Sequence, residues 1–91
     1  MTFCGYIQST HLGIVSRIDG QVPVMDHTNA RALLWLGETD DTITPAQTRA
    51  SELKFSSANR QLIASTNGGH APPDSDDPTF VQVQTWISSL P

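Results

Sequence analysis

The apolar run Ala32-Leu33-Leu34-Trp35-Leu36, which ends at Gly37-Glu38-Thr39-Asp40, determines the predicted fold. A second and shorter run, Gln61-Leu62-Ile63-Ala64, ends at Thr66-Asn67-Gly68-Gly69-His70. A near-continuous apolar run bounded by glycine is typical of a parallel strand that is covered on both faces. Because the carboxyl ends of parallel strands lie at the same edge of a sheet, the two runs predict that Asp40 and His70 come close together.

The segment between the two runs predicts a helix. Thr44 can cap it, Pro45 suits the first helical turn, and Gln47 completes a capping box. The helix is expected to run to about Phe55, with a narrow apolar stripe at Ala46, Ala50 and Leu53. A second strand is expected over 62–65. A strand–helix–strand unit with a connection this short predicts a parallel pair joined by a right-handed crossover.

A last helix is predicted to begin at Asp77-Pro78, with Asp77 as its cap and Pro78 at its first helical position. Apolar residues then recur at helical spacing, which indicates an amphipathic helix packed on a sheet; they are Phe80, Val83, Ile87 and Leu90, with Trp86 beside them.

The lead segment is the least regular part of the sequence. Its apolar residues keep neither helical nor strand period, and Gly5, Gly13 and Gly20 interrupt them as turn residues do. One or two short strands or an irregular helix fit it equally well. The predicted organisation is an irregular lead segment over 1–29, followed by a β-α-β-α segment over 30–91. The lead segment is expected to supply either one extra strand or the remnant of a cap over the sheet. The predicted fold class is α/β, as part of a three-layer α/β/α arrangement.

Composition and charge exclude several classes of function. The 91 residues carry a net charge of −4 with a pI near 5.0, and their five basic residues are scattered, which argues against a nucleic-acid or anionic membrane surface. No apolar stretch is long enough to span a bilayer and no signal peptide is visible, so a cytoplasmic protein is expected. Cys4 is the only cysteine, and no histidine pair has metal-ligand spacing on one element, so no metal or cofactor is expected.

The stretch from Ala32 to Leu90 resembles the C-terminal end of an α/β-hydrolase, a serine hydrolase of the esterase or peptidase kind. In that family the last two parallel strands carry the acid and the histidine of a catalytic triad. Gly37-Glu38-Thr39-Asp40, with Pro45 after it, resembles the motif of the acid, and Gly69-His70 that of the histidine. The order agrees with the family's sequence of Ser, then Asp, then His.

The resemblance implies roles for two residues. His70 would be the general base and acid, and Asp40 would fix its tautomer and stabilise the imidazolium. Asp41 is the alternative acid, since it lies one residue further along the chain and only the Gly-x-x-Asp pattern favours Asp40. The simpler alternative is that Asp40 forms a turn and His70 is a solvated loop residue.

The family's nucleophile motif, Gly-x-Ser-x-Gly, does not occur in the sequence, and Cys4 does not fit it either. The chain is therefore expected to be a fragment, subunit or truncated product that is inactive by itself. It would act on a small-molecule or peptide ester, thioester or amide only when completed by the missing N-terminal part. The alternative is a non-catalytic remnant that binds a partner or forms a homo-oligomer, because two strands alone would leave the run Leu33–Leu36 with an exposed sheet edge.

Overall fold

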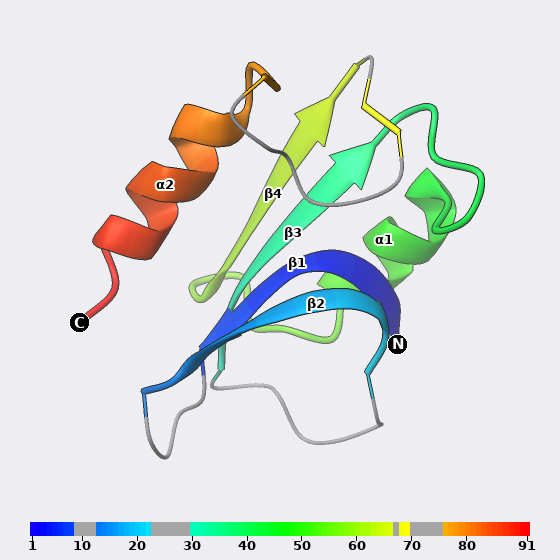
Figure 1. Ribbon diagram of the computed structural model, residues 1–91. Coiled ribbons are helices and arrows are strands. Elements are labelled where there is room, and N and C mark those ends of the chain that lie inside the picture. The colour runs from blue at the N-terminus through cyan, green and yellow to red at the C-terminus, as the bar shows by residue number, and fades with distance from the viewer. Residues whose placement is uncertain (9–12, 23–29, 67, 70–75) are drawn as a thin grey trace.

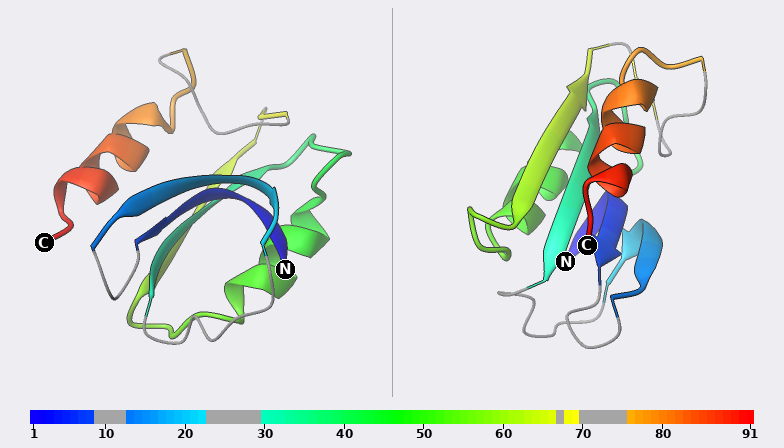
Figure 2. Two further views of the ribbon diagram at one scale, coloured as in Figure 1. Left: turned by 60° about the horizontal axis from the view of Figure 1, so that its bottom comes forward. Right: turned by 90° about the vertical axis from the view of Figure 1, so that its left-hand side faces the viewer.

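Four strands form one mixed sheet in the order β2-β1-β3-β4, and one helix packs on each face of it (Figures 1 and 2). This computed structural model describes residues 1–8, 13–22, 30–66, 68–69 and 76–91. The elements in chain order are β1 (Thr2–Gln8), β2 (Val15–Gln21), β3 (Arg31–Gly37), α1 (Pro45–Glu52), β4 (Arg60–Ser65) and α2 (Phe80–Ser88).

The strands predicted from the two apolar runs are confirmed, and so is their parallel pairing. β3 and β4 are parallel, in register from Ala32 opposite Arg60 to Gly37 opposite Ser65. β1 is antiparallel to both of its neighbours, β2 and β3. The fold is therefore of the α/β kind, with a parallel pair at one side of the sheet and an antiparallel pair at the other.

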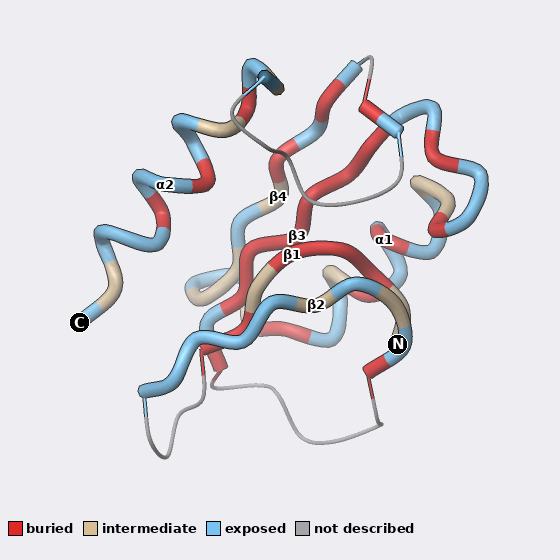
Figure 3. Tube along the Cα trace, in the orientation of Figure 1, coloured by how far each residue is buried: buried red, intermediate tan, exposed pale blue. Residues whose placement is uncertain are grey.

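β3 is buried along almost its whole length (Figure 3) because both faces of the sheet are covered there. Ala32 and Leu34 face the side of α1, in a cluster that includes Phe3 and Phe55. On the opposite face Leu33 and Trp35 pack in a second cluster, with Cys4, Ile43, Ile63, Val83 and Trp86. Alternate side chains of a strand point to opposite faces, so a strand between two apolar layers needs apolar residues at every position.

The lead segment forms two strands, which is one of the alternatives that the sequence left open. β1 is the extra strand: it pairs with β3 from Arg31 to Trp35, so the edge that two strands alone would expose is covered. Gly5 lies within β1 and not in a turn: a Cβ on it would overlap the carbonyl oxygen of Leu33, and its φ is +150°. Glycine inside a strand marks such a close backbone approach, and here it hides the strand period in the sequence.

Helix α1 begins as predicted but buries a different face. Thr44 Oγ1 accepts from the Gln47 amide at 3.3 Å, and Gln47 Oε1 accepts from the Thr44 amide at 2.9 Å, which completes the capping box. The predicted apolar stripe is wrong: its three residues are exposed, and Leu53 retains 72% of its accessible surface. The buried residues are Thr48 and Ser51, because the Ser51 hydroxyl donates to the Thr2 carbonyl and accepts from its amide, at 2.8 and 3.1 Å.

Helix α2 begins later than predicted. Its first residue is Phe80 and its N-cap position is Thr79, so Asp77 is not the cap. The buried face is rotated relative to the predicted one: Val83 and Trp86 are buried, whereas Ile87 is 39% exposed. In the part of the chain that the structure describes, neither helix is long and apolar enough to cross a membrane.

Candidate functional site

The carboxyl ends of β3 and β4 lie side by side, because the two strands are parallel and end in register (Figure 1). Gly37, the last residue of β3, is opposite Ser65, the last residue of β4. The segments that follow these two strands carry the predicted acid and the predicted histidine. The geometry of this edge therefore determines whether the two residues can cooperate.

Backbone hydrogen bonds join the two segments directly. The Glu38 amide donates to the Ser65 carbonyl at 3.0 Å, and the Thr39 amide donates to the Gly68 carbonyl at 3.0 Å. The Thr39 hydroxyl donates to the same Gly68 oxygen at 2.7 Å. The turn after β3 and the segment after β4 thus form one hydrogen-bonded unit.

Two glycines allow this close approach. A Cβ on Gly37 would overlap the carbonyl oxygen of Gly69 and lie 2.8 Å from that of Gly68. A Cβ on Gly68 would lie 2.7 Å from Ser65 Oγ and 2.8 Å from Trp35 Cη2. The glycine of the Gly-x-x-Asp pattern therefore has a steric role: it lets the second segment pass directly over the end of β3.

Asp40 is held in one orientation at this edge. It is only 6% exposed. Its Oδ1 accepts from the Thr42 amide at 2.8 Å and from the Ile43 amide at 3.0 Å. Its own amide donates to the Gly37 carbonyl, which closes the turn after β3. Ile43 anchors this turn, because its side chain is buried in the cluster on the α2 face.

The alternative acid, Asp41, differs from Asp40 in its surroundings. Asp41 is exposed, whereas Asp40 is buried against the turn. A buried and hydrogen-bonded carboxylate has a fixed position, and an exposed one does not. His70 lies outside the described residues, and the described chain before it stops at Gly69, whose carbonyl oxygen lies against Gly37.

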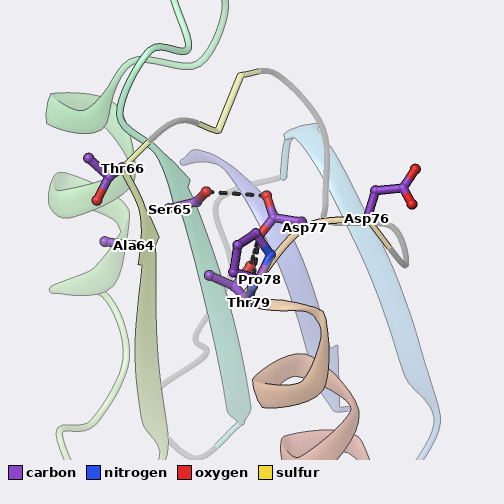
Figure 4. Close-up of a pocket in the computed structure, with 7 residues that line it drawn as sticks. All are labelled: Ala64, Ser65, Thr66, Asp76, Asp77, Pro78 and Thr79. Atoms are coloured by element: carbon purple, nitrogen blue, oxygen red, sulfur yellow. Dashed lines mark hydrogen bonds between the residues drawn. The ribbon is translucent and has the colours of Figure 1, made fainter.

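A second polar group, which was not predicted from the sequence, lies at the same edge (Figure 4). Asp77 Oδ1 accepts from the Thr79 amide at 2.8 Å and from the Thr79 hydroxyl at 2.6 Å, while its Oδ2 accepts from the Ser65 hydroxyl at 3.2 Å. The Thr79 oxygen in turn accepts from the buried Trp35 Nε1 at 2.8 Å. The sequence Asp77-Pro78-Thr79 is the signal from which this group could be predicted. In turns, an Asp side chain commonly accepts a hydrogen bond from the backbone amide two residues later.

Burial raises the pKa of Asp77, but its hydrogen bonds from the Thr79 side chain and amide and from Ser65 outweigh burial, and the net pKa is lowered from its ordinary value of 3.8. These residues line a pocket of about 520 Å³ between the end of β4 and the start of α2, with Asp76 pointing away from the bonded group (Figure 4). A carboxylate with a lowered pKa is a weak general base, so the Ser65–Asp77 contact does not activate the serine hydroxyl. Its role is to join β4 to α2.

The described residues contain no cluster of three or more His, Cys, Asp or Glu side chains that could hold a metal ion. Comparison of the chain with models of known protein families, with curated proteins and with solved structures finds no match.

Proposed function

We propose that Asp40 and His70 are the acid and the histidine of a serine-hydrolase triad that acts on an ester, thioester or amide bond. The observation that carries this proposal is the state of Asp40: a buried carboxylate at the carboxyl end of a parallel strand, oriented by two backbone amides. The neighbouring segment, which leads to His70, is hydrogen-bonded to the same turn through Gly68.

The chemistry follows from the fixed carboxylate. A carboxylate that cannot rotate can accept the Nδ1–H of an imidazole, select that tautomer and stabilise the imidazolium that forms when the other nitrogen takes a proton. His70 would then remove the proton of a serine hydroxyl as it attacks the carbonyl carbon, and would return a proton to the leaving group. Asp40 would act through His70 and would not itself be protonated.

The nucleophile would come from a polypeptide segment beyond these 91 residues, because none of their serines stands in the Gly-x-Ser-x-Gly pattern. Ser65 does not replace it, since its hydroxyl donates to Asp77, a carboxylate whose pKa is lowered and which is therefore a weak general base. The 91-residue chain alone is therefore expected to be inactive: two triad members without a nucleophile provide little catalysis. A fluorophosphonate probe should leave the purified chain unlabelled, and labelling that His70→Ala abolishes would contradict this expectation.

The Asp40–His70 pair can be tested without the serine. The nitrogen NMR shifts of the imidazoles should show His70 as the Nδ1–H tautomer. Proton NMR should show a low-field signal from this Nδ1–H, assigned to His70 because the signal is absent in His70→Gln. Asp40→Asn should shift that proton to high field, because the charge that strengthens the hydrogen bond is removed. Asn keeps an oxygen that can accept from the Thr42 and Ile43 amides, so the turn is expected to persist.

Asp41→Asn is the matched control, since it removes the same charge one residue away at an exposed position. It should leave the His70 signal unchanged. An unchanged signal in Asp40→Asn, or an equal change in both variants, would exclude the proposed pair. Loss of the signal in Asp41→Asn alone would instead assign the acid to Asp41.

A further inference from the structure

Strand β2 differs from the other three strands because none of its residues is buried (Figure 3). Ile18 and Gly20 are partly buried, and the other five residues of the strand are exposed. Within the part of the chain that the structure describes, β2 pairs with β1 alone and forms one end of the sheet. An edge strand presents backbone N–H and C=O groups that a further strand can use.

We propose that β2 is a self-association surface, on which β2 of a second copy pairs antiparallel around a two-fold axis at Ile18. The two four-stranded sheets would then join into one sheet of eight strands. This inference does not depend on the proposed hydrolase function. Asp40 lies beyond β3, with β1 between it and β2, so pairing at this edge leaves the candidate site uncovered.

The charges of β2 are complementary to themselves in this arrangement. With the axis at Ile18, Arg17 of each copy lies opposite Asp19 of the other, which gives two opposite-charge pairs. A shift of two residues in one direction would place Arg17 opposite Arg17, and a shift in the other would place Asp19 opposite Asp19. Like charges directly opposite destabilise strand pairing, so the sequence of β2 favours one register over its neighbours.

The two faces of β2 support the same register. Arg17 and Asp19 lie opposite Tyr6 and Cys4 of β1, on the α2 face of the sheet. Ile18 lies on the α1 face, where it packs against the cluster that contains Phe3. A two-fold axis perpendicular to the sheet keeps corresponding faces together, so the two Ile18 side chains would meet on the axis and extend this apolar cluster from one copy to the other.

The opposite edge of the sheet lacks these features. β4 contains one charged residue, Arg60, which already bonds the carbonyls of Glu52 and Phe55 and lies 3.8 Å from the Glu52 carboxylate. No self-pairing of β4 creates opposite-charge pairs. A single strand from each copy makes a smaller interface than a standard protein–protein contact, so the dimer should be weak and concentration-dependent.

Sedimentation velocity of the 91-residue chain over a concentration series tests the proposal. Wild type should shift from monomer to dimer as concentration rises. Arg17→Asp places two Asp–Asp pairs across the axis, and Asp19→Arg places two Arg–Arg pairs there. Each variant alone should weaken dimerisation by about tenfold or more.

Mixing the two variants is the decisive arm of the experiment. In the mixed dimer both pairs are again Asp opposite Arg, so an equimolar mixture should dimerise near the wild-type concentration although neither variant does so alone. The double variant Arg17→Asp with Asp19→Arg should also recover. This recovery distinguishes lost pairing from damage to the fold. The distinction is needed because Asp19 Oδ1 accepts a hydrogen bond from Cys4 Sγ at 3.6 Å, which Asp19→Arg removes.

Arg49→Asp on the exposed face of α1 is the control for Arg17→Asp, because it changes the net charge equally, and it should dimerise like wild type. The proposal would be overturned by a wild-type chain that remains monomeric up to about 1 mM, by a dimer that both single variants retain, or by single variants whose mixture does not dimerise. A chain that stays monomeric alone but pairs with a different polypeptide at β2 would also overturn it.

Discussion

Gly37→Ala tests whether steric fit between the two site segments holds this edge of the sheet together. The added methyl group would overlap the carbonyl oxygen of Gly69 and crowd that of Gly68. Both obstacles are backbone atoms, which cannot move aside as the end of a flexible side chain can. The segment after β4 must therefore move away from the turn after β3.

The expected magnitude follows from the hydrogen bonds that this movement breaks. Three bonds cross between the segments: Glu38 amide to Ser65 carbonyl, Thr39 amide to Gly68 carbonyl, and Thr39 hydroxyl to the same oxygen. Each contributes about 0.5–1.5 kcal/mol, so losing all three should lower the free energy of unfolding by about 1.5–4.5 kcal/mol. That is a large part of the 5–15 kcal/mol of a typical domain.

Urea unfolding followed by tryptophan fluorescence measures this loss, because Trp35 and Trp86 are both buried. Gly69→Ala is the matched control, since a Cβ there meets nothing within 4 Å. The control should be neutral, or more stable by about 0.4–1 kcal/mol because alanine restricts the unfolded chain.

A loss below about 0.5 kcal/mol in Gly37→Ala, which is the scatter of ordinary surface substitutions, would refute the steric argument. An equal loss in Gly69→Ala would refute it as well, because the effect would then belong to the flexibility of glycine and not to the close contact.

Three further predictions concern other contacts. Thr79→Val should lower the free energy of unfolding by about 1–3 kcal/mol, because the buried Trp35 Nε1 loses its acceptor, whereas Thr79→Ser should retain most of it. Because the pKa of Asp77 is lowered on folding, its carboxylate contributes fully to stability above the unfolded-state pKa of 3.8, and this contribution is lost as pH falls through the lower folded-state pKa. When the free energy of unfolding is measured against pH, Asp77→Asn should therefore lose less stability below about pH 5 than wild type does. Leu53→Ala should change the free energy of unfolding by less than about 0.5 kcal/mol, and Phe55→Ala should cost about 3–5 kcal/mol because its ring is buried edge-on against Phe3; thermal unfolding of both variants compares them.

Local patterns in the sequence determined the part of the fold that surrounds Asp40. The apolar run of β3 requires cover on both faces, Thr44 and Gln47 specify the start of α1, and a helical connection between β3 and β4 favours their parallel pairing. These features depend on neighbours in the chain, so their signals are local. The position of Asp40 at the carboxyl end of a strand follows from them. Its burial and the two amides that orient it appear only in the structure.

Tertiary contacts decided what the local patterns left open. The lead segment forms strands because β1 has β3 to pair with, and Gly5 fits only against the backbone of that neighbour. Ser51 is buried in place of Leu53 because its hydroxyl bonds both polar groups of Thr2, a residue forty-nine positions away in the sequence. Spacing along a helix shows which residues share a face. Only the surface onto which the helix docks selects the face that is buried. For α1 that surface is made by β3 and β1, and β1 belongs to the lead segment, the part with the weakest sequence signal.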